Sequence, residues 1–214
     1  GERALDSVLK NGFRHYEQSV RVVEKLEKGG KGLNLTKEVR DGILCHTKGK
    51  EADTLEGQII KIADKIAYIN HDIDDAIRAG VMNEEDIPLP LRMVLGMSKG
   101  ERINKMVINV IENSNKNIRM SEDFYKSFCE LHDFMFVAVY TNPVCKSEER
   151  KAVDMLIKMF NHYVENPGLL PYDYKIIAEE ESPERAATDY IAGMSDTYAL
   201  YEFNRLFVPK SWIE

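Results

Sequence analysis

The segment Ile62–Asp75 carries side chains suited to binding a charged ligand that also bears hydroxyl groups. Asp64, Tyr68 and Asp72 are four residues apart, so on a helix they lie one turn from each other on the same face. Lys65 directly follows Asp64, and His71 and Asp75 complete the polar set. Carboxylates, a phenol, an imidazole and an ammonium together suit a metal ion and a phosphorylated sugar. A solvated helix face would show the same spacing, so spacing alone does not decide between the two.

The other face of this segment is apolar, with steps that alternate between three and four residues. This pattern predicts an amphipathic helix that buries one side. Its apolar members are Leu55, Ile59, Ile62, Ile66, Ile69, Ile73 and Ala76. Thr54 precedes the run and can serve as the N-cap, so we expect a helix from about Thr54 to about Ala79.

Similar reasoning along the chain predicts an all-α protein, because no strand pattern, internal repeat or low-complexity tract is present. The expected helices span about 2–9, 14–30, 36–46, 54–80, 90–95, 99–115, 121–140, 147–166, 172–178 and 182–207. The stripe Phe124, Phe128, Leu131, Met135 and Val139 is core at helical spacing. Pro88 and Pro90 form the one credible boundary, which divides residues 1–87 from 88–214.

Composition limits the classes of partner. The chain has 214 residues and a formal net charge of −7, which argues against an extensive nucleic-acid surface. A polyanionic ligand would need a local basic pocket, for which Lys65 and the Lys48/Lys50 pair are candidates. No apolar run approaches the length of a membrane span. The three cysteines fit neither a disulfide framework nor a zinc spacing, so we expect small core residues in a reducing, cytoplasmic protein: Cys45, Cys129 and Cys145.

The pattern D-K-x-x-Y-x-x-x-D at residues 64–72 resembles the last motif of the HD-domain deoxynucleoside triphosphate triphosphohydrolases, the dGTPase-like enzymes. Further segments are similar to that family in the same order, nearly from end to end of the chain. They are residues 12–23, 35–44, 54–58, 166–171 and 189–199. The resemblance implies an all-α, HD-domain-like helical bundle fragment with a C-terminal helical extension.

The resemblance also implies roles for individual residues. Asp64 matches the final aspartate of the family's H…HD…D metal set, which would bind a divalent ion such as Mg²⁺, Mn²⁺ or another transition metal. Lys65 matches a phosphate-contacting lysine. Tyr68 and Asp72 match the pair that packs on the deoxyribose and binds its 3′-hydroxyl. A surface lysine and a partly buried core tyrosine are the open alternatives for Lys65 and Tyr68.

Two further residues match the family's proton-transfer machinery. Gly1-Glu2 resembles the end of the family's H-x-G-E segment, whose acid works with a histidine near the scissile phosphate. His15 matches a histidine near the triphosphate. His46, near a helix end, is a weaker candidate for the pocket. His132 and His162 are expected to pack among aromatic side chains. In the final motif, Arg185 and Asp189 are expected to pair at i, i+4.

The sequence also departs from the family pattern. The upstream histidine and the His-Asp pair of the metal set have no counterpart here, and His71-Asp72 follows the last ligand. We therefore expect this chain to correspond to the C-terminal part of an enzyme, likewise cytoplasmic and homo-oligomeric, that hydrolyses a deoxynucleoside triphosphate to the deoxynucleoside and inorganic triphosphate. The alternative is a non-catalytic helical module for nucleotide binding, regulation or assembly.

Overall fold

The computed structural model describes residues 1–47 and 49–210, and every regular element in these ranges is helical. The prediction of an all-α protein is therefore confirmed. The chain forms two compact units. Unit 1 combines Gly1–Asn34 with the chain from Glu148 onward, and unit 2 is Leu35–Ser147. Lys48, one of the candidate phosphate-binding lysines, lies outside the described residues.

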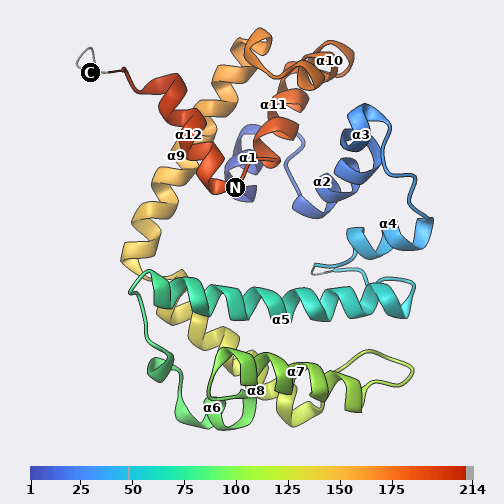
Figure 1. Cartoon of the computed structure of the whole chain (residues 1–214), viewed down its shortest axis with the longest axis vertical. Helices are drawn as coiled ribbons and strands as arrows, with labels where there is room; N and C mark the ends of the chain where they lie inside the picture. The colour runs from blue at the N-terminus through green and yellow to red at the C-terminus, as the bar shows by residue number, and fades with distance from the viewer. Residues whose placement is uncertain (48, 211–214) are drawn as a thin grey trace. The chain divides into compact units, whose positions relative to one another are not determined.

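Unit 2 is built around one long helix, α5 (Leu55–Arg78). Figure 1 shows α4 on one side of this helix and α6 to α8 on the other. The remaining elements of the unit are α4 (Lys37–Leu44), a 3₁₀ turn (Glu84–Asp86), α6 (Leu89–Leu95), α7 (Lys99–Asn113), α8 (Glu122–Met135) and a π-helical turn (Phe136–Tyr140). Because the helices on both sides of Pro88 share one hydrophobic core, the division at residues 87 and 88 falls inside unit 2. That residues 1–87 and 88–214 have separate functions, as a catalytic part and a helical companion, stays a prediction.

The start of α5 is set by Thr54, whose hydroxyl accepts a hydrogen bond from the Gly57 amide at 3.2 Å. The predicted N-cap is therefore present. The middle of the apolar stripe is buried as expected, in the residues Ile66, Ile69, Ile73 and Ala76. The prediction fails at the first turns, where Leu55 is 41% and Ile59 is 48% exposed. There α4 approaches α5 through two glycines, Gly42 and Gly57, and leaves the neighbouring apolar side chains uncovered.

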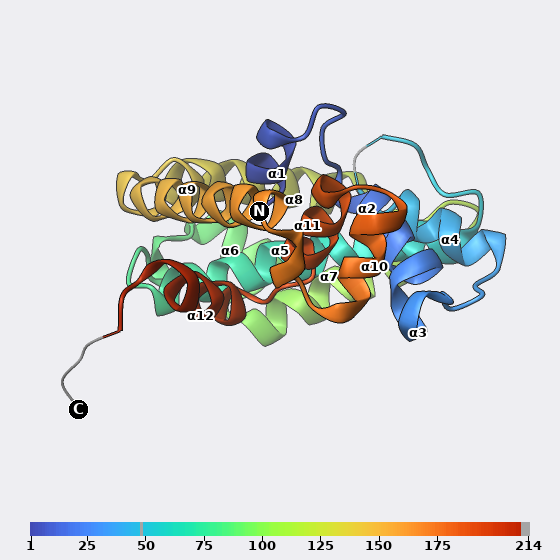
Figure 2. The same ribbon diagram turned by 90° about the horizontal axis from the view of Figure 1, so that it is seen from above.

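Unit 1 consists of short helices with their own core. The elements are α1 (Glu2–Val8), α2 (His15–Arg21), a π-helical turn (Val22–Leu26), α3 (Glu27–Gly30), a 3₁₀ turn (Pro167–Leu169), α10 (Tyr172–Glu180), α11 (Pro183–Ala192) and α12 (Asp196–Phe207). α9 (Pro143–Glu165) begins in unit 2 and contributes most of its length to unit 1. Figure 2 shows α10 beside α11, which agrees with their packing contacts.

The final predicted helix is wrong in one respect. The chain does not continue as one helix to Phe207, since α11 ends at Ala192 and α12 begins at Asp196. Gly193 terminates α11, and the Ser195 hydroxyl accepts a hydrogen bond from the Tyr198 amide at 3.3 Å, which caps a new helix. The expected start at Ser182 is confirmed, because its hydroxyl accepts from the Arg185 amide at 3.1 Å.

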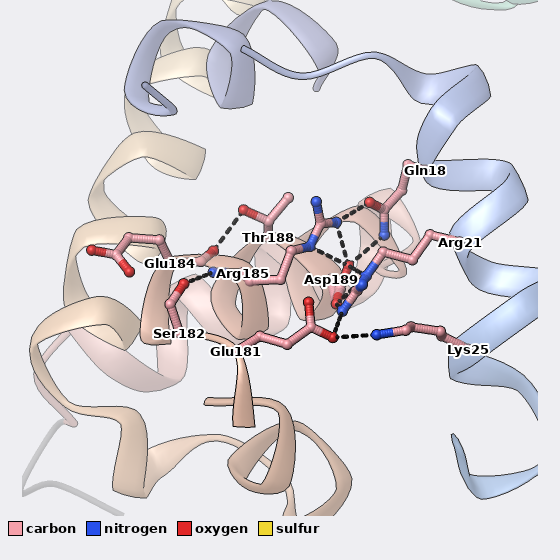
Figure 3. Close-up of polar contacts among 9 residues, drawn as sticks. All are labelled: Gln18, Arg21, Lys25, Glu181, Ser182, Glu184, Arg185, Thr188 and Asp189. Carbon is pink, nitrogen blue, oxygen red and sulfur yellow. Dashed lines mark hydrogen bonds and ion pairs between the residues drawn. The ribbon is translucent and has the colours of Figure 1, made fainter. Parts of the chain in front are cut away.

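A buried ion-pair network joins α2 to α11 (Figure 3). Asp189 has no exposed side-chain surface, and Arg21 contacts its carboxylate at 2.8 Å. The predicted Arg185–Asp189 pair is present, with Arg185 Nε donating at 3.1 Å. Gln18 Nε2 adds a third donor at 2.7 Å. Because each donor satisfies the same buried carboxylate, the network fixes the two helices in one register.

No helix among the described residues is both long enough and apolar enough to cross a membrane. All three cysteines are free thiols: Cys45 is buried, as expected for a small core residue, whereas Cys129 and Cys145 are only half-buried.

Candidate functional site

Tyr68, Asp72 and Tyr140 form a polar and aromatic cluster on unit 2. Asp72 accepts a short hydrogen bond from the Tyr140 hydroxyl through Oδ2. The rings of Tyr68 and Tyr140 lie with centroids 6.3 Å apart and planes tilted by 32°. Tyr68 remains 50% exposed. The cluster therefore offers an accessible aromatic surface beside a carboxylate that a second tyrosine holds in place.

Tyr140 is the residue of this cluster that sequence reasoning missed. It comes from the π-helical turn Phe136–Tyr140, which continues α8. Such turns are rare and occur often at functional sites, because the wider turn re-aims a side chain. The sequence signal was an aromatic residue one position beyond the core stripe that ends at Val139, just before a helix-terminating Thr-Asn-Pro. That signal does not reveal the partner, which lies 68 residues away in sequence.

The pKa of both phenols lies above the ordinary value for tyrosine. Burial is the largest cause for Tyr140, and its hydrogen bond to Asp72 adds to it. Burial is also the main cause for Tyr68. Both phenols are therefore protonated at neutral pH and serve as hydrogen-bond donors rather than as anions.

Lys65 lines a cavity of about 610 Å³ in unit 2. One wall is the face of α5 that carries Gln58, Lys61, Ile62 and Lys65, and the other is the connection from α7 to α8 with the first turns of α8. Lys65 is half-buried and is one of the side chains that line the cavity. The cavity lining combines three cations, Lys61, Lys65 and Arg119, with two carboxylates, Glu51 and Glu122, so a basic pocket for a polyanion stays a prediction.

Asp64 lies on a different side of α5 and is exposed. Among the described residues there is no group of three or more His, Cys, Asp or Glu side chains that could hold a metal ion. The residues around Asp64 therefore do not by themselves fit a divalent metal, which prefers several protein oxygens or nitrogens. Its assignment as a metal ligand stays a prediction.

Glu2 and His15, the predicted proton-transfer residues, are brought together in unit 1. His15 Nδ1 lies 2.8 Å from Glu2 Oε2, and the His15 amide donates to Glu2 Oε1 at 3.2 Å. Both side chains line a cavity of about 1090 Å³ formed by α1, α2, α9, α11 and α12. A carboxylate that holds an imidazole at such a cavity can orient it for proton transfer.

His132 and His162 pack against aromatic rings, as expected. The ring of His132 contacts Tyr140, with centroids 6.4 Å apart, and His162 packs edge-on against Phe207 at 5.2 Å. His46 Nδ1 lies 2.6 Å from the Ile43 carbonyl oxygen, near the end of α4.

Comparison with known protein families gives a match for the C-terminal part of the chain. Residues 118–205 match the family described as phosphohydrolase-associated domain. This segment includes Tyr140 of the polar cluster and all of α9 to α11.

The wider comparison is more specific. The chain is similar to deoxyguanosinetriphosphate triphosphohydrolase-like proteins of Caldanaerobacter subterraneus, at 48% identity over 216 residues, and of Clostridium perfringens, at 47% over 221 residues. The first comparison covers all of this chain and 64% of the relative. The second covers 98% of this chain and 65% of the relative. It is also 31% identical over 264 residues to such a protein of Geobacter metallireducens, with 98% of this chain and 69% of the relative covered. The chain belongs to the family of deoxyguanosinetriphosphate triphosphohydrolase-like proteins. It spans slightly less than two thirds of the length of the first two relatives.

Proposed function

We propose that the full-length protein hydrolyses a deoxynucleoside triphosphate, dGTP or a close analogue, to the deoxynucleoside and inorganic triphosphate. The observation that carries this proposal is the Tyr68–Asp72–Tyr140 cluster, one helical turn from a lysine that lines a cavity, in a chain of this family.

In this proposal the chain supplies the groups that hold the substrate. The exposed face of Tyr68 packs on the deoxyribose. Asp72 is held through Oδ2 by Tyr140, so Oδ1 accepts the hydrogen bond of the 3′-hydroxyl. Lys65, one turn along α5, contacts the phosphate nearest the sugar as a mobile point charge. A 2′-hydroxyl would have to fit beside the two tyrosine rings, which favours deoxyribose over ribose.

Glu2 and His15, which lie in unit 1, are proposed to take part in proton transfer, as their resemblance to the family implies. The Glu2 carboxylate lies 2.8 Å from Nδ1 of His15 and can hold the imidazole in one orientation for proton transfer. A divalent metal, which would polarise the phosphate when bound, is expected for the full-length enzyme with Asp64 as one ligand. The described residues do not complete that ligand set.

The test of the sugar site is the release of triphosphate from dGTP by the full-length protein and its variants. Asp72→Ala leaves a polar sugar group without a partner, which costs about 1–3 kcal/mol and lowers kcat/KM by roughly 5- to 150-fold. Asp75→Ala is the matched control, because Asp75 lies on the same helix, is 69% exposed and pairs with Arg78 at the surface. Equal kinetics for Asp72→Ala and wild type would reject the assignment.

The same assay distinguishes an enzyme from the alternative, a non-catalytic nucleotide-binding module. We expect residues 1–214 alone to bind a divalent ion weakly and to release no triphosphate, because a single exposed carboxylate supplies too few ligands. Stoichiometric metal in the purified chain, or turnover of dGTP by it, would contradict this expectation. A full-length protein that binds dGTP without turnover would favour the module.

A further inference from the structure

Arg102 is an arginine in the core of unit 2. Its side chain is 1% exposed, and it is the largest of the fully buried side chains among the described residues. Nε donates to Asn70 Oδ1 at 2.8 Å, and Nη1 pairs with Glu84. The remaining nitrogen, Nη2, is buried and has no hydrogen-bond partner in the part of the chain that the structure describes. Because an incompletely satisfied guanidinium in an apolar core lowers stability, stability does not account for its presence.

Asn70 is the residue of α5 that meets Arg102. Of the buried side chains on α5, a helix described over its whole length, Asn70 alone is polar. Its Nδ2 donates to the Ile66 carbonyl oxygen at 2.8 Å and lies 3.6 Å from Met106 Sδ on α7. The rest of this face is apolar, in the residues Ile66, Ile69, Ile73 and Ala76. Apolar contacts are non-directional, so by themselves they leave the rotation of a helix loosely defined, whereas a hydrogen bond fixes an angle.

A second polar pair joins the same two helices. Asp74, one turn after Asn70 on α5, pairs with Lys99, one turn before Arg102 on α7. The two pairs therefore follow α5 and α7 in opposite directions, as contacts between antiparallel helices do. Two directional contacts one turn apart define both the axial register and the rotation of α5 against α7.

Tyr68 and Asp72 lie on the opposite side of α5 from Asn70. At about 100° per residue, each is about 200° from Asn70, and the two are about 40° from each other. A rotation of α5 against α7 would move both side chains relative to Tyr140, which belongs to the π-helical turn after α8. The Tyr140 hydroxyl donates to Asp72 Oδ2, so this contact forms only at one rotation of the helix.

We propose that Arg102 and Asn70 are positioning residues, whose buried contact sets the rotation of α5 that brings Asp72 to Tyr140. The contact selects one arrangement of the helices rather than adding stability, as a buried polar residue does when it selects one register in a coiled coil. The assignment of the cluster to the sugar rests on the proposed function, whereas the assembly of the cluster by Arg102 and Asn70 does not.

The first measurement is the melting temperature of three variants of the 214-residue chain: Asn70→Leu, Arg102→Met and the double variant. Each single variant leaves a buried polar group unpaired and should melt below the wild type. The double variant removes both partners and should melt at or above the temperature of the wild type. Glu84 is 23% exposed, so its carboxylate is hydrated when Arg102 is absent.

The second measurement is fluorine NMR of the same chain labelled with 3-fluorotyrosine, in which the loss of a signal in Tyr140→Phe assigns the Tyr140 resonance. The wild type should give one Tyr140 resonance, and the double variant should give a shifted or split one although it is as stable. Lys105→Gln is the matched control. Lys105 lies one turn after Arg102 on α7 but pairs with Glu101 of its own helix at 3.0 Å, so the resonance should not move.

The third measurement is turnover by the full-length protein. The double variant should lower kcat/KM for dGTP about ten- to hundredfold, because a displacement of about 1 Å in a positioned group is worth up to about 100-fold, and it should lower the preference for dGTP over GTP. An unmoved Tyr140 resonance in the double variant, or a melting temperature no higher than that of the less stable single variant, would overturn the positioning role. A moved resonance with unchanged kinetics would uphold that role and reject the sugar site instead.

Discussion

Replacing Asp189 by alanine is the most informative perturbation of unit 1. The carboxylate is fully buried and accepts from Gln18, Arg21 and Arg185, which come from α2 and α11 (Figure 3). Asp189→Ala would leave Arg185 without its carboxylate partner and would leave Arg21 with Glu181 as its remaining one.

The expected cost follows from the surroundings of the two arginines. Removing one partner of a fully buried ion pair costs about 3–5 kcal/mol. Arg21 is 15% exposed and keeps Glu181 at 2.9 Å, and Arg185 is 30% exposed and keeps Gln18. Because both arginines retain a second partner and some solvent, the cost should lie at the low end, about 3 kcal/mol. Asp189→Asn retains one acceptor oxygen and should cost less.

Urea unfolding, monitored through the hydrogen exchange of the α11 backbone amides, measures this loss of stability within unit 1. The control is Lys151→Ala, which removes the surface ion pair between Lys151 and Glu148. Their side chains are 72% and 67% exposed, so the free energy of unfolding should change by less than about 0.5 kcal/mol. If Asp189→Ala costs under about 1 kcal/mol, the network is solvated and the reasoning from burial is wrong.

Three further predictions concern stability. The pKa of Glu181 is held below its ordinary value of 4.5, chiefly by its hydrogen bond from Arg21. Its stabilising contribution is therefore present above about pH 4.5 and is lost as the pH falls through the lowered pKa. When the urea midpoint is measured as the pH is lowered, it should fall less steeply in Glu181→Gln than in the wild type. Tyr163→Phe removes the donor to a buried carboxylate at 2.8 Å and should cost about 1–2 kcal/mol in thermal or urea unfolding. Gly57→Ala places a Cβ 2.5 Å from the Cβ of Ala52, beside the α4–α5 contact, and should lower the free energy of unfolding by about 1–3 kcal/mol. In the control Gly100→Ala, the new Cβ meets no atom within 4 Å, so the change should be neutral or stabilising by about 0.5–1 kcal/mol.

The features that could be predicted from the sequence are local ones. The start of α5 at Thr54, the buried stripe on that helix and the cap at Ser182 follow from side-chain spacing and from hydrogen bonds between residues three apart. The break after α11 was also readable, since a glycine and then a serine before an acidic residue is a stop followed by a start signal. The continuous apolar periodicity on both sides concealed it.

The features that could not be predicted are pairings between distant residues. Arg102 is 1% exposed, which nothing in its neighbourhood on α7 indicates. Its burial depends on Asn70, 32 residues earlier, whose Oδ1 accepts from Arg102 Nε at 2.8 Å. The same limit explains why Tyr140 was missed while its partner Asp72 was found. A polar side chain can be placed on a helix face by counting, but the residue that satisfies it is set by tertiary packing.

The neighbouring pair Asp64 and Lys65 shows how much depends on order as well as on composition. Successive residues of a helix point about 100° apart, so Lys65 turns toward the cavity with Lys61 while Asp64 turns to an exposed side flanked by the small residues Ala63 and Ala67. In the reverse order the two residues would have the same net charge, but a carboxylate would take the place of the ammonium at a cavity that Glu51 and Glu122 already line. The order Asp-Lys, rather than Lys-Asp, therefore places an ammonium instead of a carboxylate at this cavity.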